Sequence, residues 1–449
     1  MLGCKVKDMK HYVSVSLDDL VPQDNFYRRL EGKLDLEFVR ELVRAHYCSQ
    51  RGRPSIDPVV FFKLQLIMFF EGIRSERRLM EMVNLNLAHR WYIGYDLNES
   101  VPDHSSLSKI RTRYGLSVFQ CFFEKIIERC VEVGLVWGQE LYFDGSQVQA
   151  NASIDSLTDR LRLHLVTQFN PTDEVPKQSP GSVEHLSERY QGKRVAGRER
   201  TSSYRRVTDE RVSTTDADAT PMKLGLAGFS QLGYRTHYVV DGGKARIILA
   251  ALVTPASIMD NTPMLDLARW VRFRWSLQPR VAVADSKYGT LHNLAGLEQD
   301  GIRAFIPLHS QERQKHERLY SSDLFTYDAQ ENHYVCPQGQ ILEFKHPVRT
   351  TEVWIYQAKK RVCDACPVQT LCRTGKYGRS VSRSFFQDIA DRVRAYQTSA
   401  AFRRALRKRQ VWIEPLFGEG KQWHGMTRCR LRGLANVNIE GLLRAAGQN

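Results

Sequence analysis

The sequence predicts an α/β protein in which an all-α domain precedes a mixed β-sheet with flanking helices. Residues 30–135 consist of apolar segments at helical spacing, joined by short polar turns. From residue 140 onward the pattern changes to short apolar strands that alternate with helical segments, which is typical of a sheet covered by helices. With 449 residues, the chain is long enough for two or three cores.

The composition indicates a packed protein with a polyanionic partner. Hydrophobic residues make up 42% of the chain, and the formal net charge is +15. The longest apolar stretch, residues 59–70, is too short to span a membrane and contains Lys63 and Gln65. The first residues show no signal-peptide core. We therefore expect a cytoplasmic protein that binds nucleic acid rather than membrane, with its nine cysteines reduced.

Residues 1–136 are expected to form a helical, DNA-binding domain. Asp57 followed by Pro58 is typical of a helix start. Ser105 or Ser106 is expected to cap a short basic helix, in the manner of a helix-turn-helix reader. The alternative is an ordinary helical bundle with a solvated basic face. The expected phosphate-contacting residues of this helix are Lys109, Arg111 and Arg113.

Residues 137–310 are expected to form the sheet, and two of its strands end on an acid. A strand over residues 141–143 ends at Asp144, and "RVAVADSKYGT" gives a strand that ends at Asp285. Strand ends are where sites form in open α/β sheets. The alternatives are that Asp144 forms a turn and Asp285 caps a helix. Further acids are expected in turns or caps, the last of them close to the site: Asp216, Asp218 and Asp260.

A long insertion is expected inside this domain, at about residues 154–230. Residues 154–168 are expected to form a helix, residues 170–182 an exposed loop, and residues 192–207 a basic run. Two strands joined by "DGGK" follow as a hairpin, and after them come helix, strand, helix and strand.

A third acid is expected from residues 386–449, the C-terminal helical part. Two-metal phosphodiester chemistry requires several carboxylates at one point. On a continuous helix Arg407, Glu414 and Lys421 share one face, whereas Glu419 points away from it. We therefore prefer Glu414 as the third acid. Pro415 requires that the helix begins or bends there.

Several motifs together carry a resemblance to a known family. "YFDGSQVQANAS", "ADSKYGT" and "IEPLFGEGK" resemble the three acid-bearing motifs of DDE transposases from bacterial insertion sequences. "RGRPSIDPVVFFKLQLIMFFEGIRSERRL" and "PDHSSLSKIRTRYG" resemble the N-terminal helical domain of the insertion-sequence-1182 type, within the fourth and fifth insertion-sequence superfamily. The resemblance extends from about residue 20 to the end of the chain.

The resemblance implies an RNase H-like catalytic domain and a set of roles. Asp144 on the first strand, Asp285 on the fourth and Glu414 on a late helix would hold two Mg²⁺ (or Mn²⁺) ions, and Lys421 would contact phosphate. The reaction implied is cleavage of double-stranded DNA at terminal inverted repeats, followed by strand transfer into target DNA by a homodimer. The alternatives are an RNase H-like nuclease without strand transfer, or an inactive DNA-binding derivative.

The sequence departs from the signature of the wider superfamily just before the glutamate. That signature has a tyrosine seven residues and an arginine four residues before it, where this chain has Arg407 and Gln410. We expect Arg407 or Arg409 to take the role of that arginine and contact phosphate.

Residues 311–385 are expected to form a small cysteine-rich β insert. A C-x₂-C pair with two further cysteines, in a reducing compartment, is typical of a structural zinc site. His333 offers a second set of ligands in which Cys372 is spare, and the remaining alternative is free thiols. The expected zinc ligands are Cys336, Cys363, Cys366 and Cys372.

Overall fold

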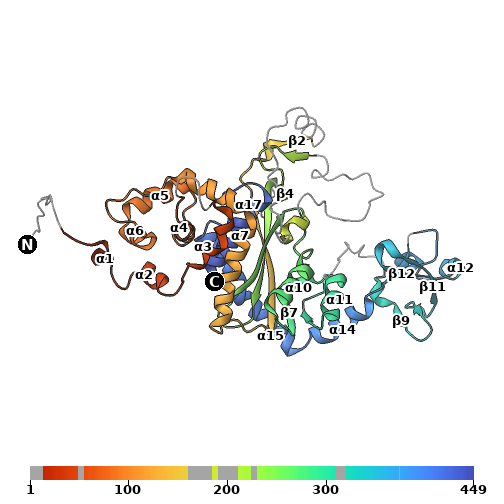
Figure 1. Ribbon diagram of the computed structural model, residues 1–449. Helices are drawn as coiled ribbons and strands as arrows, with labels where there is room; N and C mark the ends of the chain where they lie inside the picture. Colours follow the sequence, from red (N-terminus) through yellow and green to blue (C-terminus); the bar gives the residue numbers. More distant parts are fainter. Residues whose placement is uncertain are drawn as a thin grey trace, which may run out of the picture.

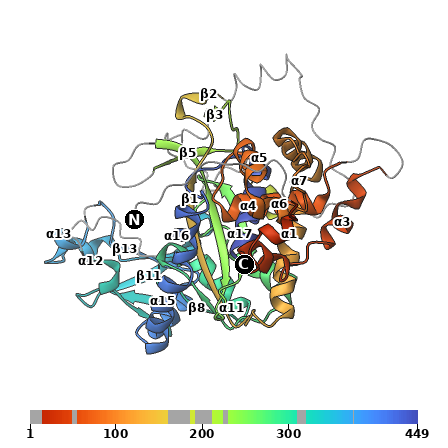
Figure 2. The same ribbon diagram turned by 90° about the vertical axis from the view of Figure 1, so that its left-hand side faces the viewer.

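The protein is built around a mixed β-sheet with helices on both faces. The computed structural model describes residues 14–48, 55–159, 185–190, 211–223, 230–308, 320–373 and 375–449. The N-terminal helices and the cysteine-rich insert lie at opposite ends of the molecule in both views (Figures 1 and 2). In the described residues, no helix is long and apolar enough to cross a membrane.

The N-terminal region is helical, as the sequence predicts. Asp57 caps α4 by accepting a hydrogen bond from the Val59 N–H at 2.8 Å, and Pro58 occupies the first helical position. α4 is apolar on all sides because other helices and the end of the chain surround it. The helices are α1 (Leu17–Leu20), α2 (Phe26–Glu31), α3 (Phe38–Val43), α4 (Pro58–Phe70), α5 (Glu76–Leu85), α6 (Leu87–Ile93) and α7 (His104–Glu132).

α7 differs from the short basic helix that the sequence suggests. Its N-cap is Asp103, which accepts a hydrogen bond from the Ser105 N–H at 2.8 Å, so neither serine is the cap. The helix is interrupted at Gly115, where φ is +64°, but does not end there. A second helical segment continues to Glu132 because its apolar side chains pack in the main core.

The central sheet has six strands in the order β4-β5-β1-β7-β8, with β6 also paired to β5. β1 is antiparallel to β5 and parallel to β7, and β8 continues parallel to β7. The hairpin, the last two strands and the helices between them occur where the sequence predicts them. The strands are β1 (Glu140–Gln149), β4 (Thr220–Lys223), β5 (Ser230–Asp241), β6 (Ile248–Pro255), β7 (Val281–Val283) and β8 (Arg303–Phe305).

The insertion after β1 does not begin with the expected helix. Residues 154–159 form a 3-10 turn (Ile154–Ser156) and a strand, β2 (Leu157–Asp159), which pairs with β3 (Arg211–Ser213). Pairing with a distant strand, which a local pattern does not reveal, decides this conformation. Residues 160–168 of the expected helix, the expected loop at 170–182 and the basic run at 192–207 lie outside the described residues.

Helices cover the sheet on both sides (Figure 1). α17 packs between β6, α7 and α4, and its Asn438 side chain bonds to the backbone N–H and C=O of Val253 on β6 at 2.8 and 2.9 Å. This helix joins the N-terminal helices to the sheet in one hydrophobic core. Outside the cysteine-rich insert, the described helices after β6 are α10 (Met264–Trp275), α11 (Leu291–Gln299), α14 (Gln387–Gln397), α15 (Ala400–Trp412), α16 (Glu414–Gln422) and α17 (Leu434–Gln448).

The cysteine-rich insert has a separate small core around Tyr334, Leu342 and Tyr356. It is an antiparallel sheet in the order β13-β12-β11-β10-β9, with two short helices. Its elements are β9 (Thr326–Asp328), β10 (His333–Val335), β11 (Ile341–Val348), β12 (Val353–Gln357), α12 (Lys360–Asp364), α13 (Gln369–Cys372) and β13 (Ser380–Ser384).

Candidate active site

Asp144 lies in the middle of β1, not at its end as the sequence suggests. β5 pairs with β1 as far as Gln149, so the strand continues beyond the acid. β7, however, pairs with β1 only as far as Tyr142. Past that point β1 has no β7 partner, and Asp144 occupies the gap with 15% of its side chain exposed.

Asp285 follows β7 by two residues and does cap the next turn. Its Oδ1 accepts a hydrogen bond from the Lys287 N–H at 2.9 Å, at the start of a 3-10 turn. Its Oδ2 is turned towards Arg409 Nη2, at 3.9 Å. One oxygen of Asp285 therefore caps the turn, and the other faces the candidate site. The capping interpretation and the site interpretation of Asp285 are compatible.

Glu414 reaches the same place from a different helix than the sequence suggests. α15 ends at Trp412 and α16 begins at Glu414, because Pro415 lacks an N–H and cannot continue α15. Arg407 therefore does not share a helix face with Glu414, and the expected seven-residue stripe is wrong. Glu419 pairs with His424 at 3.4 Å, away from the other acids.

Arg409 brings the three acids together. Its Nη1 lies 2.8 Å from Glu414 Oε1, and its Nη2 lies 3.3 Å from Asp144 Oδ2 and 3.9 Å from Asp285 Oδ2. In Figure 2, α15 and α16 run beside β1. Three acids that are 129 or more residues apart in the chain (144, 285 and 414) thus converge on one guanidinium.

The electrostatic state of Asp144 reflects this crowding. Burial raises its pKa to about 6, and the neighbouring Asp285 and Glu414 carboxylates add to the rise. The Arg409 guanidinium acts in the opposite direction and favours the ionised form. A buried carboxylate with a raised pKa beside two other acids is typical of a functional site.

The donor set fits a hard divalent cation in its chemistry. All three side chains offer carboxylate oxygens, the ligands that Mg²⁺ prefers, and Mg²⁺ needs only one or two of them. Within the described ranges, no three His, Cys, Asp or Glu side chains already lie close enough together to hold a metal ion. The Arg409 guanidinium lies among the carboxylates of Asp144, Asp285 and Glu414.

A buried polar cluster lies directly behind Asp144. A Cβ atom added at Gly145 would lie 3.0 Å from Asp260 Oδ1 and 3.3 Å from both His237 Nδ1 and Tyr288 OH. This approach to Gly145 places Asp260 close to the site, as expected, and its Oδ2 pairs with Arg235 Nη1 at 2.7 Å. Burial lowers the pKa of His237 to about 4, which keeps the imidazole neutral.

Sequence reasoning missed His237 and Tyr288. A usable signal existed for the tyrosine, which follows Asp285 by three residues and therefore turns back towards it over one 3-10 turn. His237 is opposite Gly145 in the β1–β5 ladder, and only the strand register reveals that. Asp216 and Asp218 accept hydrogen bonds from the Gly433 and Leu434 N–H groups at the start of α17, so they are capping residues as expected.

The candidate phosphate-contacting residues divide into exposed and buried ones. Arg407, Lys421, Lys109 and Arg113 are exposed, whereas Arg409 is buried among the three acids and does not present its guanidinium to phosphate in this arrangement. Arg111 is buried instead, with its Nη1 2.5 Å from Glu76 Oε1, because α5 packs against α7 at this point. Its expected contact with phosphate is therefore not available in this arrangement.

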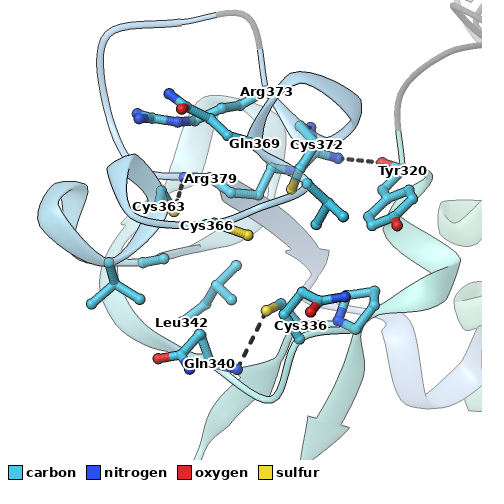
Figure 3. Close-up of a pocket in the computed structure, with 15 residues that line it drawn as sticks. Tyr320, Cys336, Gln340, Leu342, Cys363, Cys366, Gln369, Cys372, Arg373 and Arg379 are labelled. Carbon is cyan, nitrogen blue, oxygen red and sulfur yellow. Dashed lines mark hydrogen bonds between the residues drawn. The ribbon is translucent and has the colours of Figure 1, made fainter.

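The four candidate zinc ligands line one small cavity of about 30 Å³ in the insert (Figure 3). The Gln340 N–H donates to Cys336 Sγ at 3.3 Å, and the Arg379 N–H donates to Cys363 Sγ at 3.4 Å. Burial raises the pKa of the Cys372 thiol, and the other three cysteines act on it in the same direction. His333 belongs to β10 and is not among the residues that line this cavity.

Comparison with known families identifies two segments of the chain. Residues 15–113 match the family model of a transposase domain (DUF772), and residues 335–449 match that of a transposase DDE domain. The second segment contains Glu414, whereas Asp144 and Asp285 lie between the two segments. No curated protein matches the chain.

One solved structure with some similarity is a piggyBac transposase synaptic complex with hairpin DNA. The alignment covers 93% of this chain and 71% of that chain, with 9% sequence identity and a TM-score of 0.29. The assignment rests on the two family matches, which cover both ends of the chain and agree with each other. This protein belongs to the DDE transposases.

Proposed function

We propose that this transposase binds the ends of its own insertion sequence, hydrolyses a phosphodiester bond there and joins the freed 3′-hydroxyl to target DNA. The observation that supports the proposal is the convergence of Asp144, Asp285 and Glu414 on Arg409. These are the three acids that the family motifs single out, and they come from three separate elements.

In the proposed reaction Asp144, Asp285 and Glu414 hold two Mg²⁺ or Mn²⁺ ions. When bound, such ions activate the attacking oxygen and stabilise the leaving oxygen. Lys421, exposed on the same helix as Glu414, and Arg407, exposed on α15, position the phosphate backbone of the DNA. Lys109 and Arg113 contact phosphate from the N-terminal domain.

The proposed fold of the catalytic domain is RNase H-like. Its core strands in chain order are β1, β5, β6, β7 and β8, so that Asp144 is on the first and Asp285 follows the fourth. Residues 1–136 serve as the DNA-binding domain, 137–310 and 386–449 as the catalytic domain, and 311–385 as its insert.

The proposed partners are the terminal inverted repeats and a target duplex, held by a homodimer in the bacterial nucleoid. Two ends must be held together for strand exchange, which is the reason for proposing a dimer. The net charge of +15 supports attraction of the chain to DNA phosphates.

We also propose that Cys336, Cys363, Cys366 and Cys372 bind one structural zinc ion. Their positions around one cavity support this, since four thiolates are a common ligand set for structural zinc. Amide donors to two of the sulfurs favour the thiolate form that zinc requires, and Arg379 partly opposes the raised pKa that burial gives Cys372.

The central experiment is a cleavage assay on a labelled duplex that carries the inverted repeats bordering the gene. Wild type with Mg²⁺ or Mn²⁺ is expected to nick at the repeat and to transfer the 3′ end to a second duplex. Asp144→Asn, Asp285→Asn and Glu414→Gln are expected to bind the duplex normally and to lose both products. Glu419→Gln, on the same helix as Glu414, is the matched control and should retain them.

Other results would favour the rival functions. Cleavage without strand-transfer products would identify a nuclease. A wild-type chain that binds the repeats but never cuts them, with either metal ion, would identify an inactive DNA-binding derivative.

A further inference from the structure

Arg409 occupies the centre of the carboxylate cluster. Each of its two terminal nitrogens faces a different part of the cluster: Nη1 faces Glu414 at 2.8 Å, and Nη2 faces Asp144 at 3.3 Å and Asp285 at 3.9 Å. The side chain is only 10% exposed. A single positive charge thus neutralises part of a group of three acids that would otherwise repel one another.

One N–H group of the Arg409 side chain makes no hydrogen bond in this position. Its Nε is buried and has no hydrogen-bond partner. An arginine with a purely structural role usually has its buried N–H groups bonded, because an unmet buried donor is costly. The position is therefore one that the guanidinium can leave at reduced cost.

The backbone beneath Arg409 is firmly attached to the sheet. The neighbouring Lys408 donates to Glu140 Oε2 at 2.7 Å and to the Gly242 carbonyl at 2.8 Å. Trp412 donates to the Asp241 carbonyl at 3.2 Å from the next turn. Departure of the guanidinium therefore requires rotation of one side chain and no movement of α15.

We propose that Arg409 is the resident counter-ion of the metal-free cluster, and that divalent ions enter only as its guanidinium swings out. This inference rests on the proposed metal-binding role of the three acids. Arg409 is thus a positioning residue that holds the carboxylates close together before the metal arrives. As a consequence, the free protein binds divalent ions weakly, because each ion competes with the Arg409 guanidinium for the carboxylates.

The test is Mn²⁺ binding to the full-length, metal-stripped chain without DNA, measured by isothermal titration calorimetry. Arg409→Ala is expected to bind Mn²⁺ about tenfold more tightly than wild type, since one competing charge is gone. Arg409→Lys restores the charge and is expected to bind as weakly as wild type. Arg404→Ala, at another exposed arginine of α15, is the matched control and should not change the affinity.

A second measurement excludes a simple folding defect. In EDTA, Arg409→Ala is expected to melt at a lower temperature than wild type, and saturating Mn²⁺ should raise its melting temperature more than it raises that of wild type. Adding Asp144→Asn to Arg409→Ala should remove the gained affinity, which locates the site.

The outcomes separate this inference from the proposed function. If Arg409→Ala binds Mn²⁺ measurably but no more tightly than wild type, Arg409 does not compete with metal and the inference is overturned, while the cleavage assay still stands. If Arg409→Ala binds no Mn²⁺ at all, the cluster is not a metal site, and the proposed chemistry fails with it.

Discussion

Arg430 Nη1 lies 2.8 Å from Glu76 Oε1, and the same oxygen lies 2.5 Å from Arg111 Nη1. Glu76 begins α5 of the N-terminal region, whereas Arg430 lies just before α17. All three side chains are largely buried. A carboxylate between two arginines therefore joins the beginning of the chain to its end, beside the interface that α17 makes with α4 and α7.

Removal of Glu76 should loosen this junction. Glu76→Ala leaves two buried guanidiniums without their counter-ion and is expected to lower the free energy of unfolding by about 3–5 kcal/mol. Urea denaturation followed by circular dichroism measures it. The control is Glu41→Ala, whose pair with Arg44 is exposed and worth less than about 1 kcal/mol. Equal losses in the two variants would contradict the structural role of Glu76.

A methyl group at Gly145 should disturb the polar cluster behind Asp144. Gly145→Ala places a carbon 3.0 Å from Asp260 Oδ1 and 3.3 Å from His237 Nδ1 and Tyr288 OH. We expect a loss of about 1–3 kcal/mol in unfolding free energy, and reduced cleavage because the adjacent Asp144 shifts. Gly418→Ala meets nothing within 4 Å on α16 and is expected to be neutral or stabilising by up to about 1 kcal/mol. Denaturation curves that rank the two variants the other way would refute the close approach at Gly145.

The basic residues of α7 should behave differently according to their burial. Lys109→Ala and Arg113→Ala remove exposed charges and should weaken binding to any duplex. Each is expected to reduce by about 1 the magnitude of the slope of the logarithm of the DNA-binding constant against the logarithm of the salt concentration. Arg111→Ala removes a partner of Glu76 and should instead lower the melting temperature. Fluorescence anisotropy at several salt concentrations, together with thermal melts, distinguishes these effects. An unchanged slope for both exposed variants would remove α7 from the proposed DNA contact.

Zinc removal should affect the insert alone. Purified protein is expected to contain about one zinc ion per chain, and Cys366→Ser should lose it. Without zinc, residues of the insert should become sensitive to limited proteolysis while the main core stays intact, because the two cores are separate. Cys121→Ser, at an exposed cysteine on α7, should retain the metal. Wild type that contains no zinc after purification in zinc-supplemented medium would end this proposal.

Stability of the metal-free protein should depend on pH through Asp144. Its pKa is raised to about 6 in the folded chain, against 3.8 as the ordinary value, so between these pH values the folded state binds more protons than the unfolded state. The contribution of this group is therefore present at low pH and is lost as the pH rises from about 4 to 6. The whole change is at most about 3 kcal/mol. Urea denaturation in EDTA should show wild type losing stability relative to Asp144→Asn over this range, and a constant difference would contradict the raised pKa.

Much of the architecture was predictable from local pattern. The helix-start residues Asp57 and Pro58, followed by an apolar run, predict a buried helix whatever elements surround it. The DGGK turn predicts a hairpin. The three acids could be named because each lies in a recognisable short motif, and the motifs occur in a fixed order. Local sequence was misleading at residues 154–159, where pairing with β3 decides the conformation.

The sequence by itself determined which residue types are present: three acids in family motifs, four cysteines at ligand-like spacing and a basic chain. Only the tertiary structure decided which of them meet. It separated Arg407 from Glu414 by a helix break at Pro415, buried Arg111 against Glu76, and placed Arg409 among the acids. The physical reason is that strand register and helix docking bring together residues over a hundred positions apart, and neither is encoded in a short stretch of chain.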